Sequence, residues 1–556
     1  MTTPRRVSLS IGLLAFVCEG AFAQETTRSS LKSNGGQAND HSFAVVISSD
    51  GRFVVFNSDA TNLVSNDTNQ RRDVFVRDRD LGMTERVSVS SAGAEADDDC
   101  YGWSISADGR LVAFGSFATN LVSGDTNNMA DVFVHDRTTG ATELVSVNTS
   151  GAPGNGDSFT PSISLDGRFV AFSSSSSDLV ASDSNANYDI FVRDLKNGTT
   201  ELISVDTAGV QANGASGFPV ISWDGDIIAF SSDSTNLVPG DNNLVMDVFV
   251  RDRSIGMTER VSVDSSGNEA NDASFFPSVS ADGGVVAFES AAWNLIPGDG
   301  NGYHDVFVHD RNSGITECVS INSAGITGNG DCRLPNSTVS ADGRFVTFSS
   351  RASDLVAVDT NGREDAFLRD RAAGATEIIS VDSSGVQGND GSNVPSVSAN
   401  GEHIAFSSSS TNLVPNDTNG KVDAFVHDRC DAIWLNYGVG FPGTNGIPAF
   451  TARSDPVLGS TLSLDLDNAS GNYTIAVLLI GFQRTDLSTA KGGELLVVPT
   501  FLFWFPLPPG TTTFTGTLPS DPSLCAFAVD LQAFEADAGA AKGVAFTQGL
   551  ELILGN

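Results

Sequence analysis

The fold of this chain can be read outward from the stretch Ser340–Ser350, SADGRFVTFSS, in which an Asp-Gly turn precedes an apolar strand. Asp-Gly between apolar runs is typical of a β-hairpin. The same signal returns at Asp50, Asp108, Asp166, Asp224 and Asp282, and as Asn-Gly at Asn400, at intervals of 58 residues with one interval of 60. A period this regular indicates repeated supersecondary units.

Each repeat contains four short apolar segments separated by turn residues. In the third repeat these are Pro161–Ser164, Arg168–Ser173, Asp189–Asp194 and Thr200–Val205. Four antiparallel strands repeated seven times predict an all-β fold, a seven-bladed β-propeller in which radial repetition protects the strand edges. A solenoid of the same units is the alternative, but it needs distinct capping repeats, and none is evident.

The two ends of the repeat array complement each other. The seventh repeat stops after its third strand, Asp423–Arg429. The segment Thr26–Gly35, TTRSSLKSNG, precedes the first repeat and aligns with Thr84–Gly93, TERVSVSSAG, which is a fourth strand and its loop. We therefore expect the N-terminal strand to close the last blade.

The repeats resemble a known family. The hairpin Ser340–Ser350 and the later strand Asp365–Asp370, DAFLRD, look like the WD-like repeats of TolB-type propellers. The resemblance covers residues 26–429 and implies the propeller fold. It implies no single activity, because such propellers serve periplasmic scaffolds, peptidases and lyases alike.

Residues 431–556 break the period and form a separate predicted domain. Strand-like alternation recurs in Ser460–Asn468, Asn472–Phe482, Thr511–Pro519 and Gly549–Gly555, which predicts a β-sandwich. The opening Tyr437–Gly446, YGVGFPGTNG, resembles a C-terminal module of secreted bacterial multidomain proteins and implies an accessory role at the surface or in export. The predicted domains are thus residues 1–23, 24–430 and 431–556.

The first 23 residues are typical of an export signal. Arg5 and Arg6 precede the apolar run Val7–Val17, and Ala21-Phe22-Ala23 offers small residues at a cleavage site. No later segment has the roughly 20 apolar residues that a membrane-spanning helix needs. We expect an exported protein that is periplasmic, on the cell surface or extracellular.

The charge of the chain is strongly acidic, with 68 Asp and Glu against 31 Lys and Arg and a net charge of −37. Such a surface repels phosphate backbones and anionic lipids, which argues against nucleic acid and bare membrane as partners. It suits cations, a cationic partner or solubility in salt. We expect a monomeric propeller that binds a protein or glycan partner.

Five cysteines remain after removal of the signal: Cys100, Cys318, Cys332, Cys430 and Cys525. The odd number leaves at least one thiol unpaired within the chain. Cys318 and Cys332 flank one loop between blades and form the predicted disulfide.

An Asp-x-Asn-x-x-x-Asp element precedes the third strand of every repeat. Its members are Asp67/Asn69/Asp73, Asp125/Asn127/Asp131, Asp183/Asn185/Asp189, Asp241/Asn243/Asp247, Asp299/Asn301/Asp305, Asp359/Asn361/Asp365 and Asp417/Asn419/Asp423. Two carboxylates and an amide oxygen suit Ca²⁺, which prefers oxygen ligands. The alternative is an Asx-turn that shapes the entry to the strand. The sequence leaves both interpretations open.

No catalytic motif stands out. His135, His309 and His427 occupy a position that is Arg in other repeats, which predicts surface residues without a catalytic role. Residues that differ from their counterparts in other repeats are the candidates for a pocket: Tyr101, Trp103, Tyr188, Trp293, Tyr303, His304 and Arg333. Most of them fall in the acidic loops before the first and third strands, so an aromatic and basic cluster there could stack a sugar or grip a peptide.

The sequence thus favours a non-catalytic binding or scaffold protein that presents an acidic loop face and uses Ca²⁺ as its only candidate cofactor. The alternative is a polysaccharide-acting enzyme, a lyase or hydrolase, with its site in the central channel. Equivalent blades favour the first hypothesis, whereas one charged and aromatic cluster at the axis favours the second.

Overall fold

The computed structural model describes residues 7–8, 24–334, 338–429, 433–437, 441–453, 456, 460–482, 484–489, 494–518 and 528–554. Within these residues the chain is all-β. It divides into the unit Thr26–Asp428 and a second unit that includes Arg429–Asn556. The predicted export signal lies outside the described residues except for β1 (Val7–Ser8). No helix in the described part of the chain is long and apolar enough to cross a membrane.

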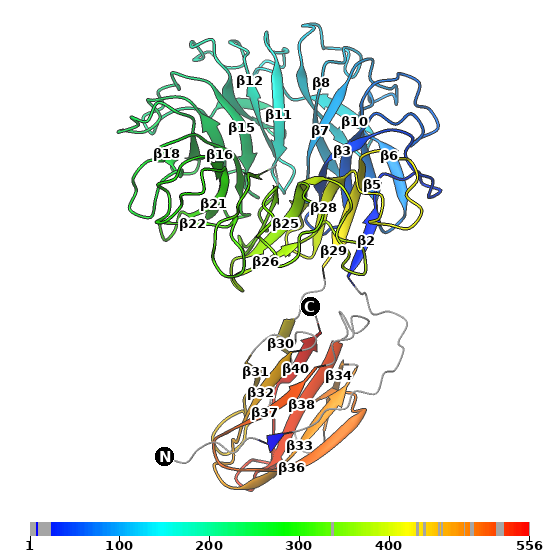
Figure 1. Ribbon diagram of the computed structural model, residues 1–556, viewed down its shortest axis with the longest axis vertical. Coiled ribbons are helices and arrows are strands. Elements are labelled where there is room, and N and C mark those ends of the chain that lie inside the picture. Colours follow the sequence, from blue (N-terminus) through cyan, green and yellow to red (C-terminus); the bar gives the residue numbers. More distant parts are fainter. Residues whose placement is uncertain are drawn as a thin grey trace. The chain divides into compact units, whose positions relative to one another are not determined.

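Seven four-stranded antiparallel sheets, like the blades of a propeller, build the unit Thr26–Asp428 (Figure 1). We number the sheets along the chain. Sheets one to three contain β3 (Ser42–Ile47), β4 (Phe53–Ser58), β5 (Asp73–Asp78), β6 (Met83–Arg86); β7 (Cys100–Ile105), β8 (Leu111–Ser116), β9 (Asp131–Asp136), β10 (Ala141–Leu144); and β11 (Ser158–Ile163), β12 (Phe169–Ser174), β13 (Asp189–Asp194), β14 (Thr199–Leu202).

The remaining sheets repeat this order. Sheets four to six contain β15 (Ser216–Ile221), β16 (Ile227–Ser232), β17 (Asp247–Asp252), β18 (Met257–Arg260); β19 (Ser274–Val279), β20 (Val285–Ser290), β21 (Asp305–Asp310), β22 (Ile315–Cys318); and β23 (Cys332–Arg333), β24 (Phe345–Ser350), β25 (Asp365–Asp370), β26 (Ala375–Ile378). Sheet seven contains β27 (Ser392–Val397), β28 (His403–Ser408), β29 (Asp423–Asp428) and β2 (Glu25–Arg28).

The N-terminal strand completes sheet seven. The strand order is β2-β29-β28-β27, so β2 takes the outer place that a fourth strand takes in the other sheets (Figure 1). The Oγ of Ser30, just after β2, donates to Asp423 Oδ1 at 2.5 Å. The prediction that the N-terminal strand closes the last sheet is confirmed.

A pair of phenylalanines forms the centre of each sheet. Phe114 of β8 lies opposite Phe133 of β9, and their ring centroids are 5.7 Å apart. Corresponding pairs occur in all seven sheets. Both rings of sheet two are fully buried and pack against valines of sheet one, such as Val55 and Val74. Stacking of neighbouring sheets therefore creates the core.

The first strands of the seven sheets surround one axis. At one end they enclose only about 100 Å³, lined by residues of all seven sheets. Backbone hydrogen bonds join the turns there from sheet to sheet, as from Ala281 N–H to Ala341 O at 3.0 Å. The Ala399 N–H donates to Ser49 O at 3.0 Å, which joins sheet seven to sheet one. We call this region the narrow end.

Arginines near the Asp-Gly turns are paired. Arg52 lies 2.7 Å from Asp78 of its own sheet. Arg137 of sheet two lies 2.6 Å from Glu85 of sheet one and over the ring of Phe53. Ion pairs of these two kinds recur in other sheets. The second kind links neighbouring sheets, and the two kinds together leave few of these arginines free for a partner.

The C-terminal unit contains β30 (Ile433–Tyr437), β31 (Phe450–Ala452), β32 (Thr461–Asp467), β33 (Thr474–Gly481), β34 (Arg484–Ser488), β35 (Glu494–Val497), β36 (Phe501–Leu507), β37 (Thr511–Thr517), β38 (Ala528–Ala536), β39 (Val544–Phe546) and β40 (Gly549–Ile553). One sheet has the order β1-β37-β32-β31 and another the order β30-β40-β38-β33-β36, with β39 beside β38. Leu464 and Phe514 of the first sheet share a core with Leu478 and Leu531 of the second.

The predicted disulfide between Cys318 and Cys332 is wrong. Both cysteines are free and buried. They end up in different sheets: Cys318 closes β22 of sheet five and lies 3.3 Å from Ser320 Oγ, whereas Cys332 opens β23 of sheet six and lies 3.2 Å from Ser350 Oγ. Each sulfur has its own hydroxyl partner. Cys430 and Cys525 lie outside the described residues.

Candidate functional site

The Asp-x-Asn elements lie in the loops before the third strands, and their Asn residues form turns. In every sheet the Asn Oδ1 accepts the N–H two residues further on. The pairs are Asn69 with Arg71, Asn127 with Met129, Asn185 with Asn187, Asn243 with Val245, Asn301 with Tyr303, Asn361 with Arg363 and Asn419 with Lys421. This bond is the signature of an Asx-turn.

The amide nitrogen of the same Asn residues anchors the turn to the neighbouring loop. The Nδ2 of Asn69 donates to Ala96 O at 3.0 Å and to Asp73 Oδ2 at 3.2 Å. The same bond to a loop carbonyl recurs in the other sheets. The acceptor lies 27 residues further on, except in sheet seven, where Asn419 donates to Ala38 O. The other donors are Asn127, Asn185, Asn243, Asn301 and Asn361. Backbone groups thus engage both ends of each of these amides, as the Asx-turn alternative expects, and calcium binding at the seven elements stays a prediction.

The second Asp of each element is completely buried at the start of the third strand. A serine of the fourth-strand segment donates to it, as Ser88 Oγ does to Asp73 Oδ1 at 2.5 Å. The first Asp lies close by, and its side chain is buried as well at Asp67, Asp125, Asp241 and Asp417. Buried charges of like sign need compensation, and the sheets supply it in different ways.

Sheets one, four and seven place an arginine between the two carboxylates. In sheet one the Nη1 of Arg86 lies 3.6 Å from Asp67, 3.1 Å from Asp73 and 3.0 Å from Glu95. Arg260 of sheet four makes the same three contacts with Asp241, Asp247 and Glu269. In sheet seven, Arg28 from the N-terminal strand contacts Asp417 at 2.8 Å and Asp423 at 3.6 Å.

Sheets three and six place a glutamine amide there instead. In sheet three the Nε2 of Gln211 donates to Asp183 at 2.8 Å and to Asp189 at 2.9 Å. In sheet six Gln387 bridges Asp359 and Asp365 at 2.9 and 2.8 Å. The positions that hold Arg86 and Glu95 in sheet one hold Leu202 and Gln211 in sheet three.

Sheets two and five have neither group. Leu144 and Pro153 of sheet two stand at the positions of Arg86 and Glu95, and Cys318 and Thr327 stand there in sheet five. Asp125 of sheet two is only 9% exposed, and its Oδ1 has no hydrogen-bond partner.

Burial raises the pKa of several of these carboxyl groups. Desolvation raises the pKa of Asp131, Asp189, Asp305 and Asp365 to about 6, and the negative charge of the neighbouring Asp adds to the rise. Among the described residues no group of three or more His, Cys, Asp and Glu side chains is arranged to hold a metal. An ion in these loops would therefore also need backbone or water oxygens.

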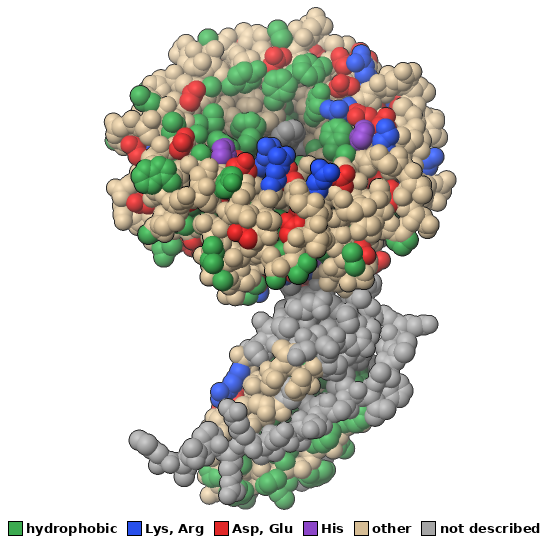
Figure 2. Space-filling view, viewed as in Figure 1, with side chains coloured by type: hydrophobic (Ala, Val, Ile, Leu, Met, Phe, Trp, Pro, Cys, Tyr) green, Lys and Arg blue, Asp and Glu red, His purple; other side chains and the backbone are tan. Residues whose placement is uncertain are grey.

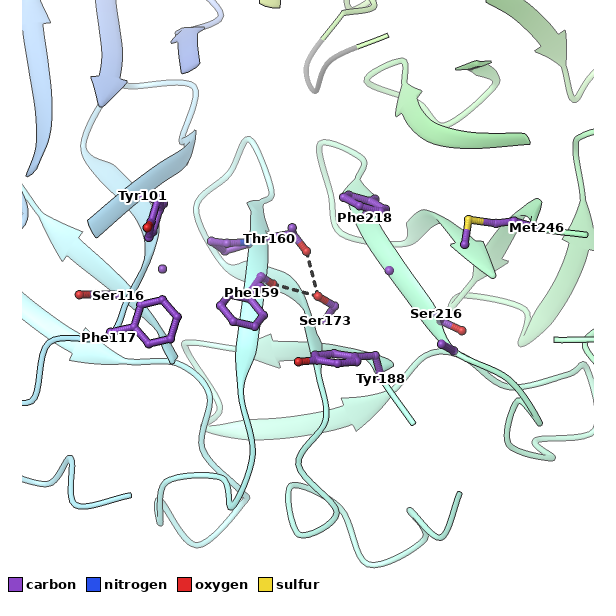
Figure 3. Close-up of a pocket in the computed structure, with 14 residues that line it drawn as sticks. Tyr101, Ser116, Phe117, Phe159, Thr160, Ser173, Tyr188, Ser216, Phe218 and Met246 are labelled. Atoms are coloured by element: carbon purple, nitrogen blue, oxygen red, sulfur yellow. Dashed lines mark hydrogen bonds between the residues drawn. The ribbon is translucent and has the colours of Figure 1, made fainter. Parts of the chain in front are cut away.

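At the opposite end of the axis, which we call the wide end, residues of the first strands line two cavities. The first, about 570 Å³, is lined by residues of sheets two, three and four, and we call it the aromatic groove. Tyr101, Phe117, Phe159, Tyr188 and Phe218 surround it (Figure 3). The rings form a series: Phe117 to Phe159 is 6.0 Å between centroids and Phe159 to Tyr188 is 6.4 Å. Partly exposed ring faces in series suit a ligand with flat apolar faces.

The second cavity, about 670 Å³, shares Phe218 with the aromatic groove and also contains charged groups, so we call it the charged cavity. Glu289 in its wall is 5% exposed, with Oε1 at 2.8 Å from His304 Nδ1 and Oε2 accepting the Leu334 N–H at 3.2 Å. Burial raises the pKa of Glu289 above its ordinary value despite these bonds.

Sheet six contributes further charges to the charged cavity. Arg333 and Glu364 line it, and Glu364 accepts a hydrogen bond from Ser349 Oγ at 3.0 Å. The face seen in Figure 2 is hollowed at its centre, with hydrophobic side chains around the hollow and acidic, basic and histidine side chains beside it. The cavity thus offers both hydrogen-bond donors and acceptors next to aromatic rings.

Several of the side chains that line the two cavities lie at a β-bulge in the first strand. Ala44, Thr160, Phe218, Phe276 and Val394 occupy the same place in five sheets and have φ between 50° and 54°. The pairing register shifts at this place, as between Gly217 and Val220. All but Thr160 line the charged cavity, and Thr160 lines the aromatic groove. Bulky residues at positive φ are strained, and such strain clusters at functional sites.

The structure brings together four of the seven pocket candidates that the sequence indicated. Tyr101 and Tyr188 line the aromatic groove, and His304 and Arg333 line the charged cavity. Trp293 and Tyr303 are exposed and line neither, and the side chain of Trp103 lies outside the described part. Sequence reasoning missed Phe117, Phe159, Phe218, Phe275, Phe276, Glu289 and Glu364. One signal was present: Glu289 stands where the other repeats have Asn, Gly or Ser.

The three histidines of the third strands are buried rather than on the surface, which corrects the prediction. His135 is 6% exposed, and its Nδ1 lies 2.9 Å from Thr142 Oγ1. Arg77 bonds the corresponding Thr84 in sheet one. Burial lowers the pKa of His135, so it acts as a neutral structural residue.

No protein-family model matches the chain, and no curated protein is significantly similar to it. Similar solved structures include a protein described as TolB from Agrobacterium tumefaciens, at 17% identity and a TM-score of 0.33, covering 53% of this chain and 89% of that one. A xyloglucanase of glycoside hydrolase family GH74 from Xanthomonas campestris has 10% identity and a TM-score of 0.38, covering 80% and 59%. The WD40 repeats of RRP9 have 8% identity and a TM-score of 0.37, covering 73% and 99%.

Proposed function

We propose that this chain is an exported, non-catalytic binding protein: a closed seven-bladed β-propeller followed by a C-terminal β-sandwich, which holds a glycan partner at the wide end of its axis. The observation that carries the proposal is the aromatic groove, where five rings from sheets two, three and four line one cavity. The seven sheets around one axis and the Ala399–Ser49 link support the closed ring.

The chemistry of the two cavities favours a glycan over a protein partner. Sugar rings have apolar C–H faces that pack on aromatic side chains, and hydroxyl edges that hydrogen-bond to charged groups. The aromatic groove supplies the first kind of surface through Phe159 and Tyr188. The charged cavity supplies the second through His304, Arg333 and Glu364. Phe218 lies in the wall of both, so one chain of sugars could occupy them together.

Affinity electrophoresis against a panel of soluble polysaccharides tests the proposal. We expect one class to retard the full chain, and F159A or Y188A to weaken that binding roughly tenfold, which corresponds to about 1.4 kcal/mol of lost ring contact. W293A is the matched control, because Trp293 is an exposed aromatic outside both cavities, and it should bind as the wild type does. Retardation by no polysaccharide, or equal loss in W293A, would contradict the proposal.

A second candidate, a polysaccharide-acting enzyme, is favoured by one observation. Glu289, whose pKa is raised by burial, shares the charged cavity with Glu364 of the next sheet, and two carboxyl groups in one cavity are the groups that glycoside chemistry uses. An enzyme would release new chain ends from the retained polysaccharide, and E289Q would stop the release while binding persists. A binding protein would release none.

A further inference from the structure

The seven Asp-x-Asn elements form an internal comparison in which the same buried carboxylate pair has different neighbours. A guanidinium lies between the two carboxylates in three sheets and a glutamine amide in two. Sheets two and five have Leu144 with Pro153 and Cys318 with Thr327 at the positions that supply these groups. Within the described residues, the protein therefore compensates five pairs with an arginine or a glutamine and two with neither.

The uncompensated pair of sheet two is the more deeply buried. Asp131 is fully buried and Asp125 is 9% exposed. Asp131 accepts bonds from Ser146 and Asn127, whereas Asp125 Oδ1 has no hydrogen-bond partner. The same oxygen of Asp67 and Asp241 also accepts no hydrogen bond, but there an arginine nitrogen lies 3.6 and 3.4 Å away. Two neighbouring buried carboxylates with an open oxygen are costly unless a positive charge joins them.

We propose that the pair Asp125 and Asp131 binds a calcium ion in the place that the Arg86 guanidinium takes in sheet one, and that Asp299 and Asp305 of sheet five bind a second. The chain thus binds two ions rather than seven. Each ion replaces the positive charge that sheets one, four and seven carry on an arginine.

The contacts of Arg86 show which oxygens converge at this place. Its guanidinium reaches both carboxylates and also the carbonyl oxygen of Asn66, at 2.9 Å. The residues that correspond to Asn66 in sheets two and five are Gly124 and Gly298. Two carboxylates and a loop carbonyl give an oxygen-only donor set, and waters would complete the shell.

This donor set suits calcium better than magnesium or a transition metal. Calcium accepts six to eight oxygens in irregular geometry, whereas magnesium needs a near-ideal octahedron. Imidazole and thiolate ligands, which transition metals prefer, are missing from the set. Cys318 does not change this, because its sulfur already lies 3.3 Å from Ser320 Oγ, and sheet two has Leu144 at the same position.

Calorimetric titration of the metal-free full chain with Ca²⁺, with Mg²⁺ as control, tests the proposal. We expect two Ca²⁺ per chain. L144R copies the arginine of sheet one into sheet two and should leave one Ca²⁺ per chain, and L144R with C318R should leave none. L202R is the matched control: it makes the same change in sheet three, where Gln211 already bridges the pair, and should keep two.

Thermal unfolding separates loss of the ion from loss of the fold. The wild type should unfold several degrees higher in Ca²⁺ than in chelator, and the L144R/C318R variant should unfold at the same temperature in both. If L144R does not fold, D125N provides the second test and should also leave one ion. No uptake by the wild type, uptake of seven ions, or two ions in L144R/C318R would overturn the proposal.

Discussion

The same first strands build both ends of the axial space, but the residues at the narrow end repeat from sheet to sheet and those at the wide end do not. At the narrow end, backbone hydrogen bonds such as Ala281 N–H to Ala341 O join the turns from sheet to sheet, and mainly serine, alanine, valine and isoleucine residues line about 100 Å³. At the wide end, Tyr101, Glu289 and Arg333 differ from their counterparts in other sheets and line the larger cavities. Repetition holds the ring together, and departures from it create the candidate site.

If repetition holds the sheets together, the largest loss of stability should come from removing one of the repeated phenylalanines. Phe133→Ala removes a fully buried ring stacked on Phe114 and should cost about 3–5 kcal/mol of unfolding free energy. Phe249→Ala makes the same change in sheet four and should cost about as much. Denaturant unfolding of both variants measures the two losses.

Phe159→Ala at the wide end is the contrasting variant. Its ring is only partly buried in the wall of the aromatic groove, so we expect a loss in stability of less than about 1 kcal/mol and a loss in glycan binding instead. If Phe159→Ala destabilised the chain as much as Phe133→Ala, the wide end would belong to the structural framework, and the division between the two ends would be wrong.

A smaller effect is expected from pH, through the carboxyls that glutamine bridges. Burial raises the pKa of Asp189 and Asp365 to about 6, above the ordinary 3.8. The folded state therefore holds these protons more tightly than the unfolded state. Their contribution to stability is full below about pH 4 and is lost as pH rises through 6, at about 1.4 kcal/mol per pKa unit and group.

The measurement is denaturant unfolding in chelator at pH 7 and pH 5. Buried His135 and His309, whose pKa values are lowered, oppose the trend over part of this range, so the informative quantity is the difference between variants. The gain in stability on acidification should be smaller in D189N/D365N than in the wild type. D136N is the control: the Arg110 guanidinium lowers the pKa of Asp136, which titrates below this window. An equal gain in all three proteins would rule out Asp189 and Asp365 as the source.

Much of the fold was readable from the sequence because it depends on local patterns that repeat. The Asp-Gly turns located the hairpins, and the match between Thr26–Gly35 and Thr84–Gly93 located the strand that completes sheet seven. The His positions were misjudged because Arg at the same position was taken as a sign of the surface, whereas Arg369 is only 8% exposed and Arg77 donates to Thr84 just as His135 pairs with Thr142.

Only some residues of the candidate site could be predicted from the sequence. Tyr101 and His304 were visible because they differ from sibling repeats, but Phe218 and Phe276 were not, because the bulge at positive φ breaks the two-residue alternation that assigns side chains to faces. Sequence reasoning also missed that some carboxylate pairs have an arginine or a glutamine between them and others have neither. This difference depends on Arg86, which is 13 residues beyond Asp73 and meets it only through strand pairing.

The smallest effect concerns the strain of that bulge, which no narrow-end residue shares within the described part of the chain. Val394 is β-branched and has φ 52°, a backbone conformation that Asn adopts far more readily. Val394→Asn should therefore raise the unfolding free energy, by up to about 1 kcal/mol. Val394→Ala removes the same methyl groups but lacks the local side-chain hydrogen bond by which Asn tolerates this conformation, so it should bring a smaller gain. Since Val394 lines the charged cavity, the stabilised variant should also bind its ligand differently. Stabilisation with unchanged binding would mean that the bulge only joins the strands, whereas stabilisation with altered binding would mean that the strain at the wide end serves to aim side chains at the ligand.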